Sequence, residues 1–272
     1  GLYSVSFEVA MLPTTELVAP INRVALPAYS RMRETETGLH AGFLDVVGLI
    51  ALVALPAAVG IAATSDLLVP LLLGTNWSDA IPVVHYLAIA GAIAALRTNT
   101  AAVMLALGRP AVLTLQQGLR LVLLVPAILV GSSIAEVTGI AIAYLLVTLI
   151  VLIMNVSVVL YLLSLPLKQY IEVIYRPAAS VAAMYLFERA LVIPWLTNLF
   201  PDSAAASAFA AIAIGAAWFI LIESGLWLLA GRPAGAESRM LQIVSEALAD
   251  PLPSVSRWLA RQNRTNQKKA NS

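Results

Sequence analysis

The chain has 272 residues, of which 60% are hydrophobic and only 11% are charged, and its formal net charge is +1. A soluble domain could not bury so much apolar surface, so the composition predicts an integral membrane protein. The absence of cysteine excludes disulfides and thiolate metal sites. No basic stripe crosses the apolar body, and no nucleic acid is expected as a partner.

Apolar stretches long enough to cross roughly 30 Å of hydrocarbon predict an all-α polytopic bundle of about seven transmembrane helices. In chain order they cover residues 2–30, 39–63, 79–107, 110–131, 134–163, 176–193 and 204–230. An odd number of spans with the tail inside would place Gly1 outside. The chain also starts with Gly and no signal sequence precedes its first apolar run, so we expect a fragment of a longer protein with at least one more helix.

The polar gaps between the stretches alternate between basic gaps and gaps without Lys or Arg. The basic gaps contain Arg31 with Arg33, Arg109, and Lys168 with Arg176, and the tail after residue 230 holds seven of the sixteen basic residues. The other gaps hold only the acidic residues Asp66, Asp79, Glu136 and Asp202. Because basic loops stay cytoplasmic, the pattern predicts a multi-pass protein of the bacterial cytoplasmic membrane with a cytoplasmic C-terminus.

This pattern divides the chain into three regions. We expect five core transmembrane helices over 1–163, an interfacial helix with two further spans over 164–230, and a basic cytoplasmic tail over 231–272. The interfacial helix is predicted because Lys168, Glu172 and Arg176 recur at spacing four, opposite an apolar stripe. A second short helix that does not cross is expected over 65–73 at the outer surface, where Pro70 would cut it.

The first span carries prolines every seven residues, at Pro13, Pro20 and Pro27, which fall along one side of a helix. Each proline frees the carbonyl four residues earlier, and backbone left open at membrane depth must face protein or water. Glu16 and Arg23 share that side. The pattern predicts a bent helix that lines a wet cleft; the alternative is a kinked packing helix whose Arg23 pairs with Asp45.

Two arginines are predicted at the middle of the membrane. Arg97 lies twelve residues before the turn residue Arg109, and Arg120 lies eleven after it. They are surrounded by a polar layer that consists of Thr98, Asn99, Thr100, Gln116 and Gln117. An unpaired guanidinium there costs about 3 kcal/mol, so it needs a cavity, a ligand or a counter-charge. Two guanidiniums suit a pyrophosphate; the alternative is internal pairing with Glu16 or Asp45.

The last two spans contain Glu188, Arg189 and Glu223. Adjacent residues on a helix point about 100° apart, so Glu188 and Arg189 are expected near the outer interface rather than as a buried pair. The two histidines, His40 and His85, lie at span ends on opposite sides. Neither a metal site nor an acid–base pair is therefore predicted.

Several blocks resemble the Wzx-type polysaccharide flippases of the multidrug/oligosaccharidyl-lipid/polysaccharide (MOP) exporter superfamily. The matching blocks are residues 1–13, 20–24 and 27–31, residues 69–74 with Trp77, Ala80 and Pro82, and residues 105–110. The resemblance covers about residues 1–165. It implies a MATE-like transporter with two helical lobes, of which this chain is most of the second, so a missing N-terminal lobe is an expected partner. Glu8 departs from the pattern, since many relatives have a basic residue there.

The resemblance further implies a flippase that exports an undecaprenyl-pyrophosphate-linked oligosaccharide for surface or exopolysaccharide synthesis by alternating access. No cofactor is expected; the partners would be the lipid-linked oligosaccharide, membrane lipids and a polysaccharide polymerase. The substrate-binding candidates are Arg23, Arg97, Arg120, Asn22, Asn99, Gln116 and Gln117. Glu16 or Asp45 would be the titrating carboxylate that couples transport to an ion gradient.

Three other classes of function remain to be weighed. An enzyme would need catalytic side chains on a sizeable outer loop, whereas these gaps are short and lack Lys and Arg, so no catalytic residue is predicted. A drug or metabolite antiporter of the same superfamily would place carboxylates and aromatics, not arginines, in its cavity. A non-transporting membrane scaffold would pair all of its buried charges internally.

Overall fold

The computed structural model describes residues 1–32, 36–200, 203–231 and 235–249. All regular structure in these residues is helical, which confirms the predicted all-α fold. In chain order the elements are α1 (Leu2–Leu12), the π-helix η1 (Pro13–Val18), α2 (Ala19–Met32), α3 (Glu36–Ala63), α4 (Ser65–Leu73), the 3-10 helix η2 (Thr75–Trp77), α5 (Ala80–Ala106), α6 (Pro110–Leu162), α7 (Leu167–Phe187), the π-helix η3 (Glu188–Val192), α8 (Ile193–Leu199), α9 (Ala204–Leu229) and α10 (Ala236–Ala249). Arg33, Asp202, Arg232 and the tail from residue 250 lie outside the described residues.

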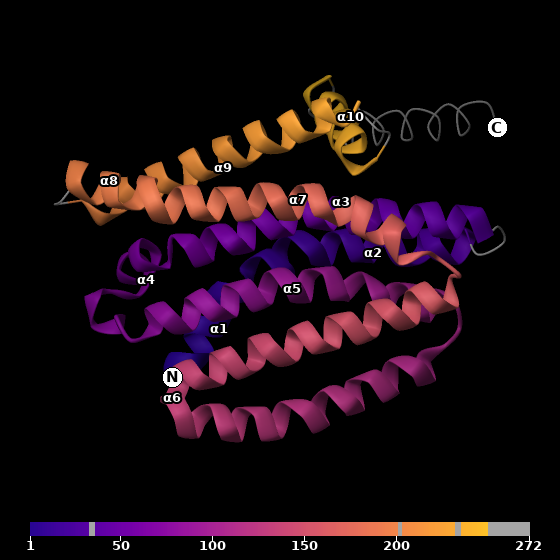
Figure 1. The fold of residues 1–272 in the computed structure, drawn as a ribbon, viewed down its shortest axis with the longest axis horizontal. Helices are drawn as coiled ribbons and strands as arrows, with labels where there is room; N and C mark the ends of the chain where they lie inside the picture. The colour runs from indigo at the N-terminus through magenta and orange to yellow at the C-terminus, as the bar shows by residue number, and fades with distance from the viewer. Residues whose placement is uncertain (33–35, 201–202, 232–234, 250–272) are drawn as a thin grey trace, which may run out of the picture.

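The long helices run side by side along one axis, so their ends gather at two opposite ends of the bundle (Figure 1). The end of α2 with Arg31 and the starts of α6 and α7, next to Arg109 and Lys168, meet at what we call the basic end. Gly1, α4 with Asp66, and the turn of α6 at Glu136 lie at the opposite, acidic end. The alternation of charge along the sequence therefore corresponds to two separate surfaces of the fold.

Within the described residues, five helices are long and apolar enough to cross a membrane: Gly38–Ala63, Ala80–Ala106, Pro110–Leu162, Leu167–Leu199 and Ala204–Leu229. The third of these doubles back on itself and accounts for two of the predicted spans. The predicted span at residues 2–30 is helical but is not among the five, because its charged and polar residues lower its hydropathy, most of all in α2.

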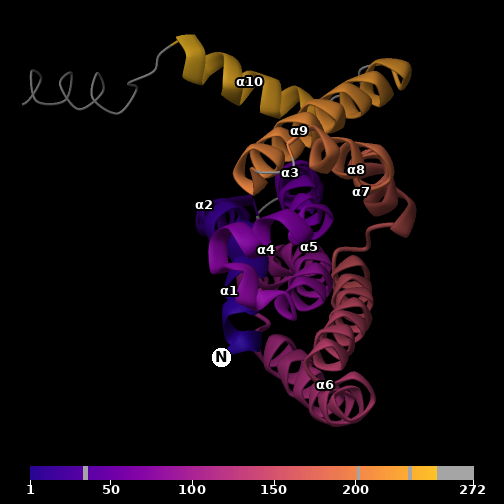
Figure 2. The same ribbon diagram turned by 90° about the vertical axis from the view of Figure 1, so that its left-hand side faces the viewer.

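Helices α3 and α5 form the centre of the bundle. Viewed along the axis, α1 and α2 lie to one side of them, α6 below, and α7 and α9 above (Figure 2). The α3–α5 interface includes the buried alanines Ala51, Ala54 and Ala58 of α3 and Ala92 and Ala95 of α5. Such small side chains let two helix backbones approach closely, which is how helices associate where no water drives them together.

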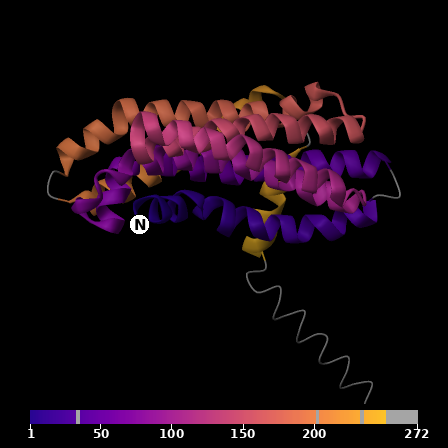
Figure 3. The same cartoon turned by 90° about the horizontal axis from the view of Figure 1, so that it is seen from below.

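The first span is interrupted at the first of its three prolines. Pro13 begins the π-helix η1, and Thr15 Oγ1 donates to the carbonyls of Met11 and Leu12 at 3.3 and 3.2 Å. Thr14 Oγ1 donates to the Gly91 carbonyl of α5 at 3.1 Å. The two hydroxyls thus supply hydrogen bonds beside the break, and α1, η1 and α2 continue as one curved segment (Figure 3).

Helix α6 is a hairpin of two legs, residues 110–134 (leg 1) and 137–162 (leg 2). Ala135 and Glu136, with φ of −144° and 48°, leave the helical conformation and reverse the chain. Beside this turn Gly131 and Gly139 bring the legs into backbone contact, since a Cβ on either glycine would overlap the carbonyl of the other. The predicted short helix over 65–73 is also present as α4, and it continues through Pro70 to Leu73 instead of stopping there.

The structure does not separate the helix predicted before residue 176 from the span that follows it. Helix α7 runs without a break from Leu167 through Pro177, and Leu167–Leu199 forms a single candidate span. Arg176, expected on the polar face of an interfacial helix, is buried and pairs with Glu237 of α10. A window of sequence around residue 176 does not contain this distant partner, so the pattern indicated a water-facing stripe.

The Gly131–Gly139 contact yields the first prediction. Replacing Gly139 by valine should force the legs of α6 apart and lower the stability by about 1–3 kcal/mol, as overpacking does. The readout is the Tm of detergent-purified protein. Gly118→Val on leg 1 is the matched control, because a Cβ there meets no neighbour. Equal Tm values for the two variants would contradict the tight contact.

Candidate substrate site

Arg97 of α5 and Arg120 of leg 1 lie close enough to repel each other electrostatically. Both side chains are partly buried. Arg120 Nη2 donates to the hydroxyl of Tyr144 on leg 2 at 3.2 Å, and its guanidinium carbon lies 5.8 Å from the centre of that ring. The structure therefore brings together the two arginines that the sequence placed at mid-membrane, and adds an aromatic partner.

Aromatic residues of α1 lie beside Tyr144. Tyr3 stacks on Phe7 at 6.1 Å between ring centres, and the rings of Phe7 and Tyr144 are nearly perpendicular, with their centres 5.7 Å apart. Tyr3 also interacts electrostatically with Arg120 and Tyr144. Three elements, α1, α5 and α6, thus converge on the two guanidiniums.

The arginine pair has no carboxylate partner in the described part of the chain, where no ion pair involves Arg97 or Arg120. The alternative pairing with Glu16 or Asp45 is not found. Asp45 instead meets Arg239 of α10 at 2.6 Å, and Glu16 is exposed. Two like charges held together without a counter-ion repel each other, and an anionic ligand would relieve that repulsion.

The predicted amide ligands differ in their surroundings. Asn22 Nδ2 donates to Thr98 Oγ1 at 2.8 Å and joins α2 to the polar layer next to Arg97. Asn99 is fully buried and accepts from Tyr29 at 2.8 Å, so in this conformation it is a core residue. Gln117 is exposed on leg 1. Their role as substrate ligands stays a prediction.

Gln116 stands out among these amides because it is buried and neither its side-chain nitrogen nor its oxygen has a hydrogen-bond partner within the described residues. An unsatisfied buried polar group costs about 1–3 kcal/mol. Gln116 precedes Arg120 by four residues, so the two share one face of leg 1. A polar ligand held at Arg120 could satisfy this amide.

The exposed face of the first span holds the remaining candidates. Glu16, Pro20, Arg23 and Pro27 are all exposed and recur every three or four residues, so they form one stripe along η1 and α2. No ion pair of the described residues joins Arg23 to Asp45. The stripe is separate from the Arg97–Arg120 pair, and any ligand that contacts both would have to bridge the first span and α6.

A second polar cluster ties α10 to the bundle. Arg176 meets Glu237 at 2.7 Å, with about a tenth of each side chain exposed, and Asp45 meets Arg239 at 2.6 Å. We call these two ion pairs the C-terminal clamp. Helix α10 lies across the long axis of the bundle, where Ala236 packs closely against Gly48 of α3 (Figures 1 and 2).

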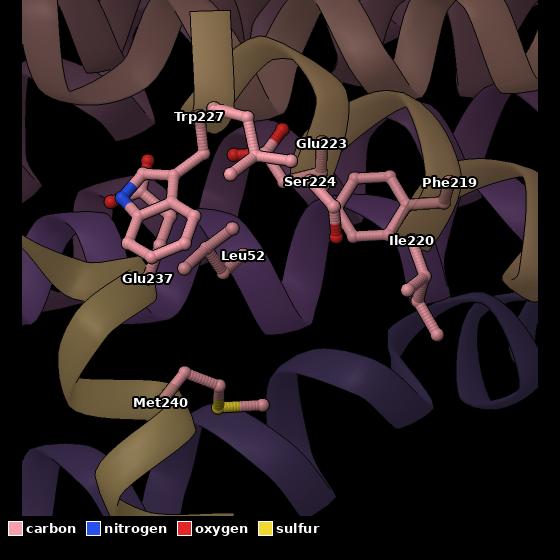
Figure 4. Close-up of a pocket in the computed structure, with 9 residues that line it drawn as sticks. Leu52, Phe219, Ile220, Glu223, Ser224, Trp227, Glu237 and Met240 are labelled. Atoms are coloured by element: carbon pink, nitrogen blue, oxygen red, sulfur yellow. The ribbon is translucent and has the colours of Figure 1, made fainter. Parts of the chain in front are cut away.

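A cavity lies beside the clamp, between α3, α9 and α10. Figure 4 shows the carboxylates of Glu223 and Glu237 and the indole of Trp227 together at one side of it, while the rest of the lining is mostly apolar. Glu223 accepts from Ser180 at 2.6 Å. These acids have partners in neighbouring helices, so the cavity has the contacts of a structural interface.

The charges near the acidic end are arranged differently from the prediction. Glu188, expected near the outer interface, is almost completely buried against Gly215 of α9 at this end of the bundle. Arg189 forms an ion pair with Asp66 of α4. The two adjacent charges do not pair with each other, as predicted. Among the described residues no group of His, Asp or Glu could hold a metal ion.

Sequence reasoning missed Tyr3 and Tyr144, the aromatic members of the site. Tyr144 is a phenol within an apolar run, and Tyr3 and Phe7 are four residues apart on one helix face. These are visible signals, but aromatic residues at helical spacing are more often core. Only the position of Arg120 against Tyr144 identifies the contact.

Comparison with known proteins gives a consistent class. A family model described as a polysaccharide biosynthesis protein matches residues 1–82. The chain is 26% identical over 178 residues to the lipopolysaccharide biosynthesis protein WzxC of Escherichia coli K12, covering 65% of this chain and 36% of that protein. It is 24% identical over 184 residues to the teichuronic acid biosynthesis protein TuaB of Bacillus subtilis, covering 68% and 38%.

A third relative is an uncharacterized membrane protein in the cps region of Klebsiella pneumoniae, 24% identical over 146 residues, which cover 54% of this chain and 30% of that protein. No solved structure gives a significant match. The chain therefore spans about a third of the length of the relatives it matches. The matches confirm the resemblance to Wzx-type polysaccharide flippases of the MOP superfamily.

The C-terminal clamp yields the second prediction. Glu237→Ala leaves Arg176 buried without its partner and should lower stability by about 3–5 kcal/mol. The loss should appear as a lower Tm and as faster protease cleavage at α10. Replacing both partners by methionine should recover much of the stability, because an apolar pair leaves no buried charge. Glu172→Ala is the control, since the Lys168–Glu172 pair is exposed; an equal loss there would contradict the clamp.

Proposed function

We propose that this chain forms one lobe of a flippase that moves an isoprenoid-pyrophosphate-linked oligosaccharide across the bacterial cytoplasmic membrane. The observation that carries the proposal is the Arg97–Arg120 pair, held within a membrane bundle without a carboxylate partner among the described residues. The resemblance to polysaccharide biosynthesis proteins supports the substrate class. No covalent chemistry is required of the chain.

The chemistry of the pair fits a diphosphate better than a neutral sugar. Each guanidinium can hold phosphate oxygens in a bidentate fork, and two forks match the two phosphoryl groups of a pyrophosphate. The low dielectric between the helices strengthens both the repulsion between the two guanidiniums and their attraction to an anion. Gln116, Asn22 and Gln117 would add hydrogen bonds to phosphate or sugar.

Alternating access would use two lobes that rock around this site. In this proposal the exposed stripe of the first span, with Glu16 and Arg23, lines the hydrated cleft between the lobes. The basic end, with Arg31, Arg109 and Lys168, would face the cytoplasm, and 231–272 would form a cytoplasmic tail. A second lobe of the same protein and a polysaccharide polymerase are the proposed partners.

Coupling to an ion gradient would need a carboxylate that water can reach both when the cleft opens inward and when it opens outward. Asp45 is engaged by Arg239, whereas Glu16 is exposed on the cleft side of the first span. Glu16 is therefore the better of the two coupling candidates. Asp45 fits the structural role of the clamp.

The two alternatives fit the site less well. A drug or metabolite antiporter would gain little from two neighbouring guanidiniums, which repel a cationic drug. A non-transporting scaffold has no use for like charges that repel each other at membrane depth. Neither alternative accounts for the unsatisfied Gln116 beside Arg120.

The test is export of lipid-linked oligosaccharide in cells depleted of their own flippase, complemented by the full-length protein. Wild type should restore export, and Arg97→Gln or Arg120→Gln should reduce it at least tenfold at matched membrane levels, a loss of about 1.4 kcal/mol or more. Each variant keeps a polar side chain of similar length but loses the charge.

Arg109→Gln is the control, because Arg109 lies in the α5–α6 turn at the basic end. Full export by both site variants would assign the pair a structural role. Loss of folding instead of export would favour the scaffold. A wild type that restores no glycan export with any donor tested would overturn the substrate class.

A further inference from the structure

We propose that the groove between the two legs of α6 holds the isoprenoid tail of the substrate while its pyrophosphate is held at Arg97 and Arg120. The inference rests on the proposed function and names a second subsite for the same ligand. It starts from an apolar groove of about 520 Å³ on the hairpin. No lining residue has a polar side chain.

The groove is a slot that narrows toward the hairpin turn, where the legs touch at Gly131 and Gly139. Its lining includes Leu123 and Ala127 of leg 1 and Ala143 and Leu146 of leg 2. The Arg120–Tyr144 hydrogen bond joins the two legs beside the slot, and the lining continues past Tyr144 to Ile150 on leg 2.

The shape of the slot excludes a further helix as its occupant and admits a single hydrocarbon chain. A further helix is about 10–12 Å across with its side chains, and legs in backbone contact at one end cannot receive it along their length. A single flexible hydrocarbon chain can follow a narrow slot. The protein itself leaves much of this apolar lining uncovered, since Val130, Ile134, Leu146 and Ile150 are each more than half exposed.

Charge and continuity favour an anionic isoprenoid lipid over a bulk phospholipid. Leu123 follows Arg120 by three residues, and Ala127 follows Leu123 by four, so the cation and the slot share one face of leg 1. On leg 2, Ala143 of the slot directly precedes Tyr144. An amphiphile with a diphosphate head at Arg120 would therefore find its hydrocarbon path beginning one helical turn away.

The experiment places a photo-crosslinking amino acid on the full-length protein in cells that make the lipid-linked glycan. Leu146 lines the slot, and Leu129 is the control, because it is 65% exposed on leg 1 but does not line the slot. Crosslinked glycan lipid, detected by release of its sugar, should be at least fivefold more abundant at Leu146. Adding Arg120→Gln should remove most of that adduct.

A pair of variants tests the same slot without a probe. Ala127→Phe fills it, whereas Val125→Phe places the same ring on an exposed residue of the same leg that does not line it. Only Ala127→Phe should lower export, by about tenfold, at an unchanged Tm. Equal adducts at Leu146 and Leu129, adducts of phospholipid alone, or equal export by the two phenylalanine variants would overturn the tail site. Wild-type export in the same cells reports separately on the proposed function.

Discussion

Within the hydrocarbon of a membrane, a charged or polar group can be stabilised by only three kinds of partner. These are an opposite charge, a hydrogen-bonding neighbour, and a ligand or water in a cavity. This constraint organises the bundle. Arg176 meets Glu237, Asp45 meets Arg239, and Arg189 meets Asp66, so each of these charges is matched across two elements. Arg97 and Arg120 instead lie close enough to repel each other, and Arg120 lies over the ring of Tyr144.

The same constraint acts on the backbone of the first span. The prolines remove hydrogen bonds that no solvent can replace in lipid, and the chain responds with a π-helix and with threonine hydroxyls that reach nearby carbonyls. A span interrupted in this way tolerates a polar stripe only where water or protein covers it. The local defect and the exposed Glu16 and Arg23 are thus two consequences of one sequence pattern.

The features that repeat along one helix could be predicted from the sequence. Hydropathy located the spans, the charged gaps separated the two ends of the bundle, and the distances from Arg109 placed Arg97 and Arg120 at one depth. Depth is a property of position along a helix, and the rise per residue is nearly constant.

Partner choice could not be predicted, because it depends on how each helix is rotated about its own axis and on segments far away in the chain. Asp45 was weighed as a partner of Arg23 at matching depth, yet it meets Arg239 in a helix that the sequence showed only as a weak apolar stripe. Asn99 was grouped with Arg97 two residues earlier, but about 200° of rotation turns it into the core toward Tyr29. Glu188 was assigned to the interface because nothing in its neighbourhood indicated that Gly215 would leave room for it.

These contacts divide the bundle into two parts with different physical tasks. The C-terminal clamp joins α3 and α7 to α10 in two separate ion pairs, and Glu223 of α9 accepts a hydrogen bond from Ser180 of α7. Moving one of these helices alone would strand a charge in an apolar medium, so they should move as one body.

Leg 1 of α6 has no such restraint: Gln116 is its one buried residue, and Arg120 contributes a hydrogen bond to leg 2. A leg with a single buried residue, joined to its neighbour by one arginine, can respond to what binds that arginine. The arginine pair without a carboxylate partner among the described residues and the sparsely buried leg 1 therefore coincide, which is the arrangement expected where ligand binding is converted into movement.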